Sequence, residues 1–225
     1  MKWLMNGLIR LAKKDWQSSM KNVLLYGDSF FWGVNAQIAG RHDFADRIGT
    51  ICQTKLGAAY NVVTEGLRGR TMYGENGWFP ERDGLAQFGP IFASHLPLDV
   101  VVIMLGTNDL NTKTKHDATS IALALDQYKE KMKFWCEFMK YDVPELILIS
   151  PPEISAAELT VFKDIFEGSA KKIGELKQAL RNYASQHGHT FLDAAEVVKS
   201  YGQDGIHLSA EENKKLAQAI SELIT

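Results

Sequence analysis

Short apolar runs and longer helical patterns alternate along the chain. The runs have few polar interruptions, which is typical of strands buried on both faces of a parallel sheet. Five such runs are found, at Asn22–Tyr26, Tyr60–Thr64, Asp99–Leu105, Glu145–Ser150 and Thr190–Leu192. Apolar residues recur at helical spacing over Phe44–Leu56, Asp117–Lys140, Phe162–Gln186 and Ser209–Leu223.

This alternation predicts an α/β fold. Strand–helix–strand units with right-handed crossovers place helices on both faces of a parallel sheet. We therefore expect a three-layer α/β/α sandwich around a doubly wound, five-stranded parallel sheet. The stretch Met72–Gly84 follows neither pattern and is rich in Gly, Asn and aromatic residues, so we expect a loop near the strand ends. Ser209 and Glu212 have the spacing of a capping box at the start of the last helix.

Composition excludes several classes of protein. The 225 residues are 45% hydrophobic and 23% charged, which is ordinary for a globular domain. A net charge of −2 gives no support for nucleic-acid binding through phosphate neutralisation. No apolar run approaches the ~20 residues that a transmembrane helix needs.

The N-terminal segment and the cysteines bear on domain organisation and location. Residues 1–20 form an extension to a single domain over residues 21–225. The extension is either an amphipathic helix, with Trp3, Leu4, Leu8 and Leu11 on one face, or the product of a misassigned start before Met20. It lacks the long apolar stretch and the cleavage site of a signal peptide. Cys52 and Cys136 lie on apolar helix faces, as buried reduced thiols do, so we expect a cytoplasmic protein.

Four polar clusters follow predicted strands or precede the last helix. They are Gly27–Ser29, Glu65–Thr71, Gly106–Asp109 and Asp204–His207. The carboxyl ends of parallel strands meet at one edge of a sheet, where ligands bind. Each cluster alone is a common turn or cap, but their order along the chain predicts one shared site.

The residue types in these clusters suit nucleophilic catalysis. Ser29 needs a base to become a nucleophile, and His207 lies three residues from Asp204, which can orient its imidazole. The developing oxyanion needs hydrogen-bond donors. The backbone N–H groups of Ser29 and Gly69 and the side-chain amide of Asn108 are the candidates.

Other kinds of site find no support. No serine lies in a Gly-x-Ser-x-Gly elbow, and there is neither a P-loop nor a His-Glu-x-x-His motif. The remaining histidines are scattered without metal-ligand spacing. We therefore expect no metal site and no cofactor.

These clusters resemble the blocks of the SGNH, or GDSL-type, hydrolases. The four blocks correspond to Ser29, Gly69, Asn108 and His207, and the resemblance covers about Lys21 to Leu223. Further stretches resemble the bacterial arylesterase and acyltransferase branch: Leu96–Asp99, Ile103–Asp109, Ser150–Pro152 and Ile165–Gly168. The resemblance implies a flavodoxin-like SGNH hydrolase fold, a triad of Ser29, Asp204 and His207, and an oxyanion hole from Ser29, Gly69 and Asn108. It also implies activity on small-molecule esters, acyl transfer to alcohols and assembly into homo-oligomers.

Neighbours of the triad predict the substrate pocket. Phe30 and Trp32 follow the nucleophile and Ile206 precedes the base, while Phe162, Ile165 and Phe166 line an apolar site by resemblance. The preferred function is a serine carboxylic-ester hydrolase for small, largely apolar acyl or aryl esters. The alternatives are a carbohydrate acetylesterase, which would need an open polar groove, and a non-catalytic flavodoxin-like binding module, which would need a broken triad or a phosphate loop after the first strand.

Overall fold

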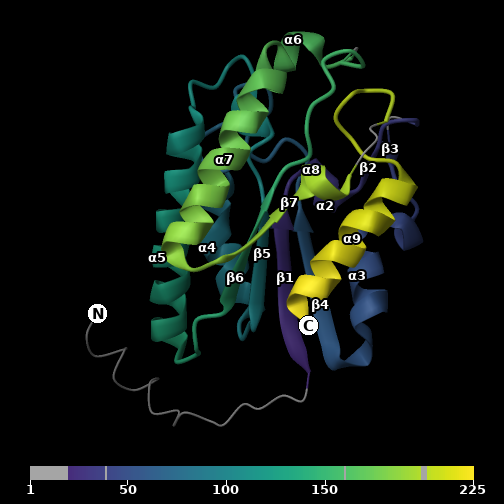
Figure 1. Cartoon of the computed structure of the whole chain (residues 1–225). Helices are drawn as coiled ribbons and strands as arrows, with labels where there is room; N and C mark the ends of the chain where they lie inside the picture. Colours follow the sequence, from purple (N-terminus) through teal and green to yellow (C-terminus); the bar gives the residue numbers. More distant parts are fainter. Residues whose placement is uncertain (1–19, 39, 160, 199–201) are drawn as a thin grey trace.

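Five parallel strands form the central sheet of the computed structural model, which describes residues 20–38, 40–159, 161–198 and 202–225 (Figure 1). Their order across the sheet is β4-β1-β5-β6-β7, and every pairing is parallel. The bounds are Lys21–Gly27 for β1, Tyr60–Gly66 for β4, Val100–Met104 for β5, Glu145–Ser150 for β6 and Thr190–Asp193 for β7. All five predicted strands are therefore present.

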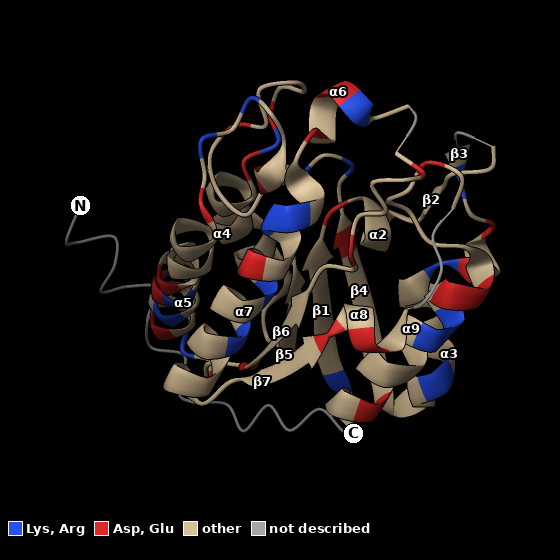
Figure 2. Ribbon diagram, turned by 45° about the horizontal axis from the view of Figure 1, so that its top comes forward, with Lys and Arg blue, Asp and Glu red and all other residues tan. Residues whose placement is uncertain are grey.

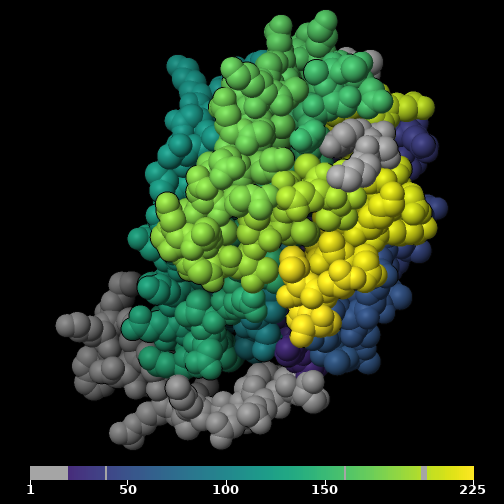
Figure 3. All heavy atoms as spheres, viewed as in Figure 1, coloured from purple at the N-terminus to yellow at the C-terminus, as the bar shows by residue number. Residues whose placement is uncertain are grey.

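Helices cover both faces of this sheet (Figure 1). One face carries α4 (Gly84–His95), α5 (Ala118–Met139) and α7 (Ser169–His187). The other carries α3 (Ile48–Leu56), α8 (Ala194–Val197) and α9 (Ala210–Ile224). In the space-filling view, α7 and α9 hide most of the strands from the side of the edge strand β7 (Figure 3). The three-layer α/β/α prediction is confirmed.

The strands are apolar throughout because each face of the sheet has its own core. Side chains alternate along a strand, so Val100 and Val102 pack with α3 and α9, whereas Val101 and Ile103 pack with α4, α5 and α7. Charged residues lie mostly on the outer surfaces of the helices and in the loops (Figure 2). Among the described residues, no helix has the length and hydropathy needed to cross a bilayer.

Two predicted helices are each divided into two. The first begins as a 3-10 turn, η1 (Phe44–Asp46), and the extended backbone of Arg47 separates that turn from α3. The second is divided at Gly168, whose left-handed φ of 75° separates α6 (Lys163–Phe166) from α7. Ser209 accepts a hydrogen bond from Glu212 N, as an N-cap does.

Other elements were not expected from the sequence. Helix α4 was missed because Gly84, Gly89 and Pro90 weaken a helical pattern. A short hairpin, β2 (Val34–Asn35) and β3 (Gly40–Arg41), follows the single turn α2 (Ser29–Trp32). The remaining elements are the 3-10 turns η2 (Gly57–Ala59) and η3 (Asn108–Leu110). The predictions for residues 1–19 lie outside the described residues.

Candidate active site

The register of the sheet brings the polar clusters to one level. Gly27 at the end of β1 is paired with Gly66 on one side and with Met104 on the other. The segments that carry Ser29, Gly69 and Asn108 therefore leave the sheet at the same edge. This edge lies at the top of Figure 1, beside α2. At Gly66 the approach is so close that a Cβ would lie 2.2 Å from Trp32 N, so only glycine lets α2 pass over the end of β4.

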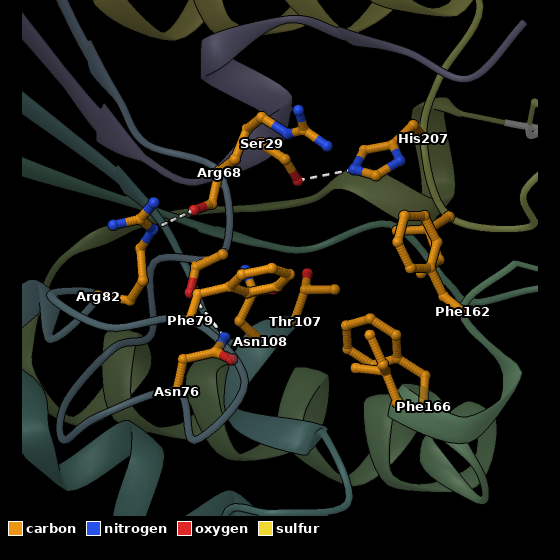
Figure 4. Close-up of a pocket in the computed structure, with 13 residues that line it drawn as sticks. Ser29, Arg68, Asn76, Phe79, Arg82, Thr107, Asn108, Phe162, Phe166 and His207 are labelled. Carbon is orange, nitrogen blue, oxygen red and sulfur yellow. Dashed lines mark hydrogen bonds between the residues drawn. The ribbon is translucent and has the colours of Figure 1, made fainter. Parts of the chain in front are cut away.

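Ser29, His207 and Asp204 form a continuous hydrogen-bonded chain. His207 Nε2 lies 2.8 Å from Ser29 Oγ (Figure 4). On the other side of the ring, Nδ1 lies 2.6 Å from Asp204 Oδ2. All three residues are buried, and Ser29 and His207 are separated by 178 positions in the sequence. A carboxylate can only accept a hydrogen bond, so Nδ1 carries the proton and Nε2 is left to accept one from the hydroxyl.

Asp204 is arranged to stay ionised. Its Oδ1 accepts hydrogen bonds from the backbone N–H groups of Ile206, at 3.0 Å, and His207, at 2.9 Å. Burial by itself would raise the pKa of Asp204, but these bonds and the contact with the His207 ring outweigh it and hold the pKa below its ordinary value. The intervening Gly205 has a φ of 73°, and a Cβ there would lie 2.7 Å from Ser155 O. The loop therefore presents a fixed negative charge to the imidazole.

Ser29 stands at the first position of α2. Asp28 caps this turn by accepting a hydrogen bond from Phe30 N at 3.1 Å. Burial raises the pKa of Asp28 to about 7, against the hydrogen bond from Phe30 and the positive charge of Arg70. The N–H of Ser29 has no acceptor within the helix, as at every helix start, and is available beside the hydroxyl.

The backbone at Gly69 is held from both sides. Its φ of 79° favours glycine. Asn76 Nδ2 donates to Gly69 O at 2.8 Å, and Arg82 Nε donates to Arg68 O at 2.7 Å (Figure 4). The two carbonyls are occupied in this way, and Gly69 itself lines the same cavity as Ser29.

The Asn108 amide is already engaged in this structure. Its Nδ2 donates to Asp28 Oδ2 at 3.2 Å and to Arg70 O at 3.0 Å. These two bonds use both amide hydrogens. Asn108 lines the cavity, but it can donate to an oxyanion only by sharing or giving up one of these partners.

Arg70 connects the segments around this amide. Its guanidinium donates through Nη1 to the carbonyls of Gly27, at 2.8 Å, and Glu65, and it lies 4.3 Å from the centre of the Tyr26 ring. Burial lowers its pKa, yet arginine remains charged in this setting. The Arg70 side chain thus binds the ends of β1 and β4, while the Arg70 backbone carbonyl accepts a hydrogen bond from Asn108.

A second buried carboxylate supports the loop after Gly69. Asp109 Oδ2 accepts from Met72 N at 2.7 Å, and Oδ1 lies 3.3 Å from His116 Nδ1. The His116 ring stacks on Tyr73 at 3.9 Å between ring centres. Burial raises the pKa of Asp109, against the hydrogen bonds from His116 and Met72. Asp109 therefore fixes the Met72–Tyr73 backbone rather than facing the cavity.

A cavity of about 240 Å³ opens beside the Ser29 hydroxyl (Figure 4). Its walls are mainly apolar, and no acidic side chain is among the 13 residues that line it. They are Ser29, Arg68, Gly69, Asn76, Phe79, Arg82, Thr107, Asn108, Phe162, Ile165, Phe166, Ile206 and His207. Four of the six predicted pocket residues, Phe162, Ile165, Phe166 and Ile206, are among them.

The other two predicted pocket residues, Phe30 and Trp32, do not line this cavity. The helical turn that begins at Ser29 rotates each following side chain by about 100°. Phe30 is consequently buried in the core, with its ring centre 5.8 Å from that of His207. Trp32 turns toward the guanidinium groups of Arg41 and Arg68. The prediction assumed that sequence neighbours of the nucleophile share its direction, which a helix prevents.

Sequence reasoning missed five cavity residues. Three of them, Asn76, Phe79 and Arg82, lie in the irregular Met72–Gly84 stretch, whose expected position near the strand ends was the available signal. The other two, Arg68 and Thr107, adjoin predicted oxyanion residues. Thr107 Oγ1 is buried and has no hydrogen-bond partner among the described residues.

Among the residues that the structure describes, no group of three or more His, Cys, Asp or Glu side chains is placed to hold a metal ion. Cys52 and Cys136 are buried free thiols. The chemistry at hand is therefore that of a serine, an imidazole, a carboxylate and nearby hydrogen-bond donors.

Comparison with known proteins points in the same direction. A family model described as GDSL-like lipase/acylhydrolase matches residues 25–214. The solved structure of an aryl esterase from M. smegmatis is 31% identical, with a TM-score of 0.85, and the match covers 91% of this chain and 98% of that one. A carbohydrate acetylesterase from Sinorhizobium meliloti is 29% identical, with a TM-score of 0.84 and the same coverage. The search of curated proteins found no match.

Proposed function

Because this chain belongs to the GDSL-like lipase/acylhydrolase family, we propose that it hydrolyses small, largely apolar acyl or aryl esters through a covalent acyl-enzyme on Ser29. The observation that carries this proposal is the hydrogen-bonded chain from Ser29 through His207 to Asp204, which opens into an apolar cavity. We assign Ser29 as nucleophile, His207 as general base and acid, and Asp204 as the residue that orients the imidazole.

In the first half of the reaction, Ser29 Oγ attacks the carbonyl carbon of the ester while its proton passes to His207 Nε2. The carbonyl oxygen becomes an oxyanion, facing the N–H groups of Ser29 and Gly69 and the amide of Asn108. When the carbonyl re-forms, the bond to the alcohol oxygen breaks and that oxygen takes the proton from Nε2. The alcohol leaves and the acyl group stays on Ser29.

In the second half, water attacks the acyl carbon and gives one proton to His207 Nε2. The bond from the acyl carbon to Oγ then breaks, and Oγ takes the proton back. The products are one carboxylic acid and one alcohol for each ester and water consumed. Asp204 keeps its negative charge throughout and stabilises the transient imidazolium.

A covalent label and a substrate series test this assignment. We expect the protein to hydrolyse p-nitrophenyl esters from acetate to octanoate and phenylmethylsulfonyl fluoride to modify the Ser29 hydroxyl, as seen by peptide mass spectrometry. The Ser29→Ala variant should lose roughly 10⁴–10⁶ in kcat while its circular dichroism spectrum is unchanged. Modification of another residue by the label, or retention of more than a tenth of the activity in Ser29→Ala, would show that Ser29 is not the nucleophile.

Removal of acetyl groups from carbohydrates is the second candidate, because one of the similar structures is a carbohydrate acetylesterase. The walls of the cavity weigh against a sugar as the main ligand: Phe79, Phe162 and Phe166 offer apolar rings. Acetylated xylan, tested beside phenyl acetate at equal acetyl concentration, separates the two. We expect phenyl acetate to have the higher kcat/KM.

Acyl transfer to alcohols also belongs to the proposal. An apolar alcohol must compete with water at about 55 M, and each buried CH₂ group contributes about 0.8 kcal/mol toward that competition. Phe162 and Phe166 provide apolar surface beside His207 (Figure 4). Benzyl alcohol and a vinyl ester in buffer should yield some benzyl ester by chromatography, and acid alone at every alcohol concentration would limit the protein to hydrolysis.

We further propose a homo-oligomer in the cytoplasm. Phe134 and Phe138 on α5 are exposed and stack with ring centres 6.2 Å apart, and burial of such a surface favours association. The two buried free thiols suit a reducing compartment. Light scattering of wild type beside a Phe134→Ser, Phe138→Ser double variant tests the assembly, and cell fractionation tests the location.

A further inference from the structure

We propose that Arg68 selects esters whose acyl part ends in a carboxylate, an inference that rests on the esterase function proposed above and narrows its substrate class. The proposed mechanism uses the reacting atoms and the apolar walls of the cavity. Two arginines that also line the cavity beside Ser29, Arg68 and Arg82, have no part in it.

Arg82 is engaged by its own loop. Its Nε donates to Arg68 O at 2.7 Å, and its Nη1 donates to the carbonyls of Pro80 and Glu81. In Figure 4 its guanidinium lies on the far side of the Arg68 carbonyl from Ser29. Arg82 therefore supports the backbone that carries Arg68 and Gly69, and it is not placed to meet a substrate.

Arg68 differs because its guanidinium has no anionic partner. In the described part of the chain, no carboxylate lies within 4.0 Å of its nitrogens. Its guanidinium makes a cation–π contact with the Trp32 ring, whose centre lies 5.3 Å from Cζ. Arg41 lies over the same ring at 4.7 Å. The aromatic face orients Arg68 without neutralising it, so a positive charge stands at a cavity whose described lining contains no acid.

The position of Arg68 relative to His207 indicates which part of the ester it meets. The alcohol oxygen must receive its proton from His207 Nε2, so the leaving alcohol lies on the His207 side, near Phe162 and Phe166. The acyl chain then extends the other way. In Figure 4 the Arg68 guanidinium lies across the Ser29 hydroxyl from the rings of Phe162 and Phe166. Arg68 thus faces the acyl chain.

A carboxylate is the anion that matches this group. The planar guanidinium presents paired N–H donors at the spacing of two carboxylate oxygens. Because this contact is made equally in the ground state and the transition state, it should act on KM rather than on kcat. Since Arg68 is exposed, solvent limits the effect to about two- to fivefold.

Monoethyl glutarate and ethyl glutaramate provide a matched pair of probes. The two esters share the same leaving alcohol and chain, but the first ends in a carboxylate and the second in a neutral amide of similar shape. Ethanol release at pH 7 gives kcat and KM for each. We expect the wild type to prefer monoethyl glutarate about two- to fivefold in kcat/KM. The preference should shrink as ionic strength rises from ~0.01 M to ~1 M, which shortens the Debye length from about 30 Å to about 3 Å.

Three variants identify the residue responsible. Arg68→Gln should abolish this preference, by raising KM for monoethyl glutarate relative to KM for ethyl glutaramate without a selective change in kcat. Arg68→Lys should retain part of the preference, since the charge remains without the paired donors. Arg41→Gln is the control, because it removes an equal charge from the same Trp32 ring at a residue that does not line the cavity. It should keep the full preference.

The outcomes separate this inference from the function on which it rests. Equal use of both probes by wild type, or an unchanged preference in Arg68→Gln, would show that Arg68 is only a surface arginine on Trp32. The esterase assignment would then still stand on p-nitrophenyl ester hydrolysis. Absence of hydrolysis of every ester would overturn both.

Discussion

Replacement of Asn108 by alanine tests the oxyanion hole most directly, because the structure changes the expected size of the effect. A donor that waits unpaired for the oxyanion typically contributes about 10²–10³ in kcat. The Asn108 amide instead donates to Asp28 and to the carbonyl of Arg70 before any substrate binds. The amide therefore lowers the activation free energy only by the difference between the hydrogen bond that it gives to the oxyanion and the one that it gives up.

The magnitude follows from that exchange. A hydrogen bond to a neutral carbonyl is worth about 0.5–1.5 kcal/mol, and one to a charged group about 1.5–3 kcal/mol. Transfer of one amide hydrogen from Arg70 O to the oxyanion thus gains roughly 1–2 kcal/mol, which corresponds to a factor of about 5–30 in rate. We expect Asn108→Ala to lower kcat by this factor with little change in KM. The variant should also unfold more easily, by about 1–3 kcal/mol, because buried acceptors lose a donor.

Steady-state kinetics with p-nitrophenyl acetate and urea unfolding measure the two effects separately. Asn111→Ala is the control, since this buried amide also donates two hydrogen bonds, to Asn76 O and Asn108 O, and accepts two, from Lys113 N and Thr114 N, without lining the cavity. It should lose at least as much stability as Asn108→Ala while kcat changes less than about threefold. An unchanged kcat with a raised KM in Asn108→Ala would refute the oxyanion role. A loss beyond 10² would refute the competition with Arg70 and Asp28.

Four further predictions follow from the site. Thr107→Val should raise the free energy of unfolding by about 1 kcal/mol, because it replaces a buried hydroxyl that has no partner among the described residues; a lower midpoint in urea would mean that the hydroxyl is bonded. Since burial raises the pKa of Asp28 from its ordinary 3.8 to about 7, the proton that the folded state holds on Asp28 stabilises the fold fully below pH ~4, and this stabilisation is lost as pH rises through ~7. The stability of Asp28→Asn relative to wild type should therefore increase between pH 4 and 8, on the order of 4 kcal/mol, and a difference that is constant with pH would contradict the shift. Because the pKa of Asp204 is held below its ordinary value, the fall of kcat/KM in acid should not steepen near pH ~4, the ordinary aspartate pKa, and a steeper slope there would contradict the shift. EDTA should leave activity unchanged, and inactivation that a divalent ion reverses would reveal a metal site.

Local patterns determined the sheet and the reacting residues. A strand buried on both faces must be apolar at every position, so the five runs could be recognised without knowledge of their neighbours. The carboxyl ends of parallel strands always meet at one edge, and this rule alone places Ser29, Gly69 and Asn108 at one site. His207 and Asp204 could be paired because they are three residues apart on one loop.

The tertiary structure decided the surroundings of those residues. The turn of α2 buries Phe30 and points Trp32 at Arg68, so sequence adjacency to Ser29 did not indicate a place in the cavity. Phe79 reaches the cavity from a loop without periodicity, where no pattern specifies direction. Asp28 is buried, and the Asn108 amide is engaged by Asp28 and by the carbonyl of Arg70, which lies in the loop after β4. Hydrogen-bond partners and desolvation are set by three-dimensional packing, and a linear pattern records only the periodicity of each segment.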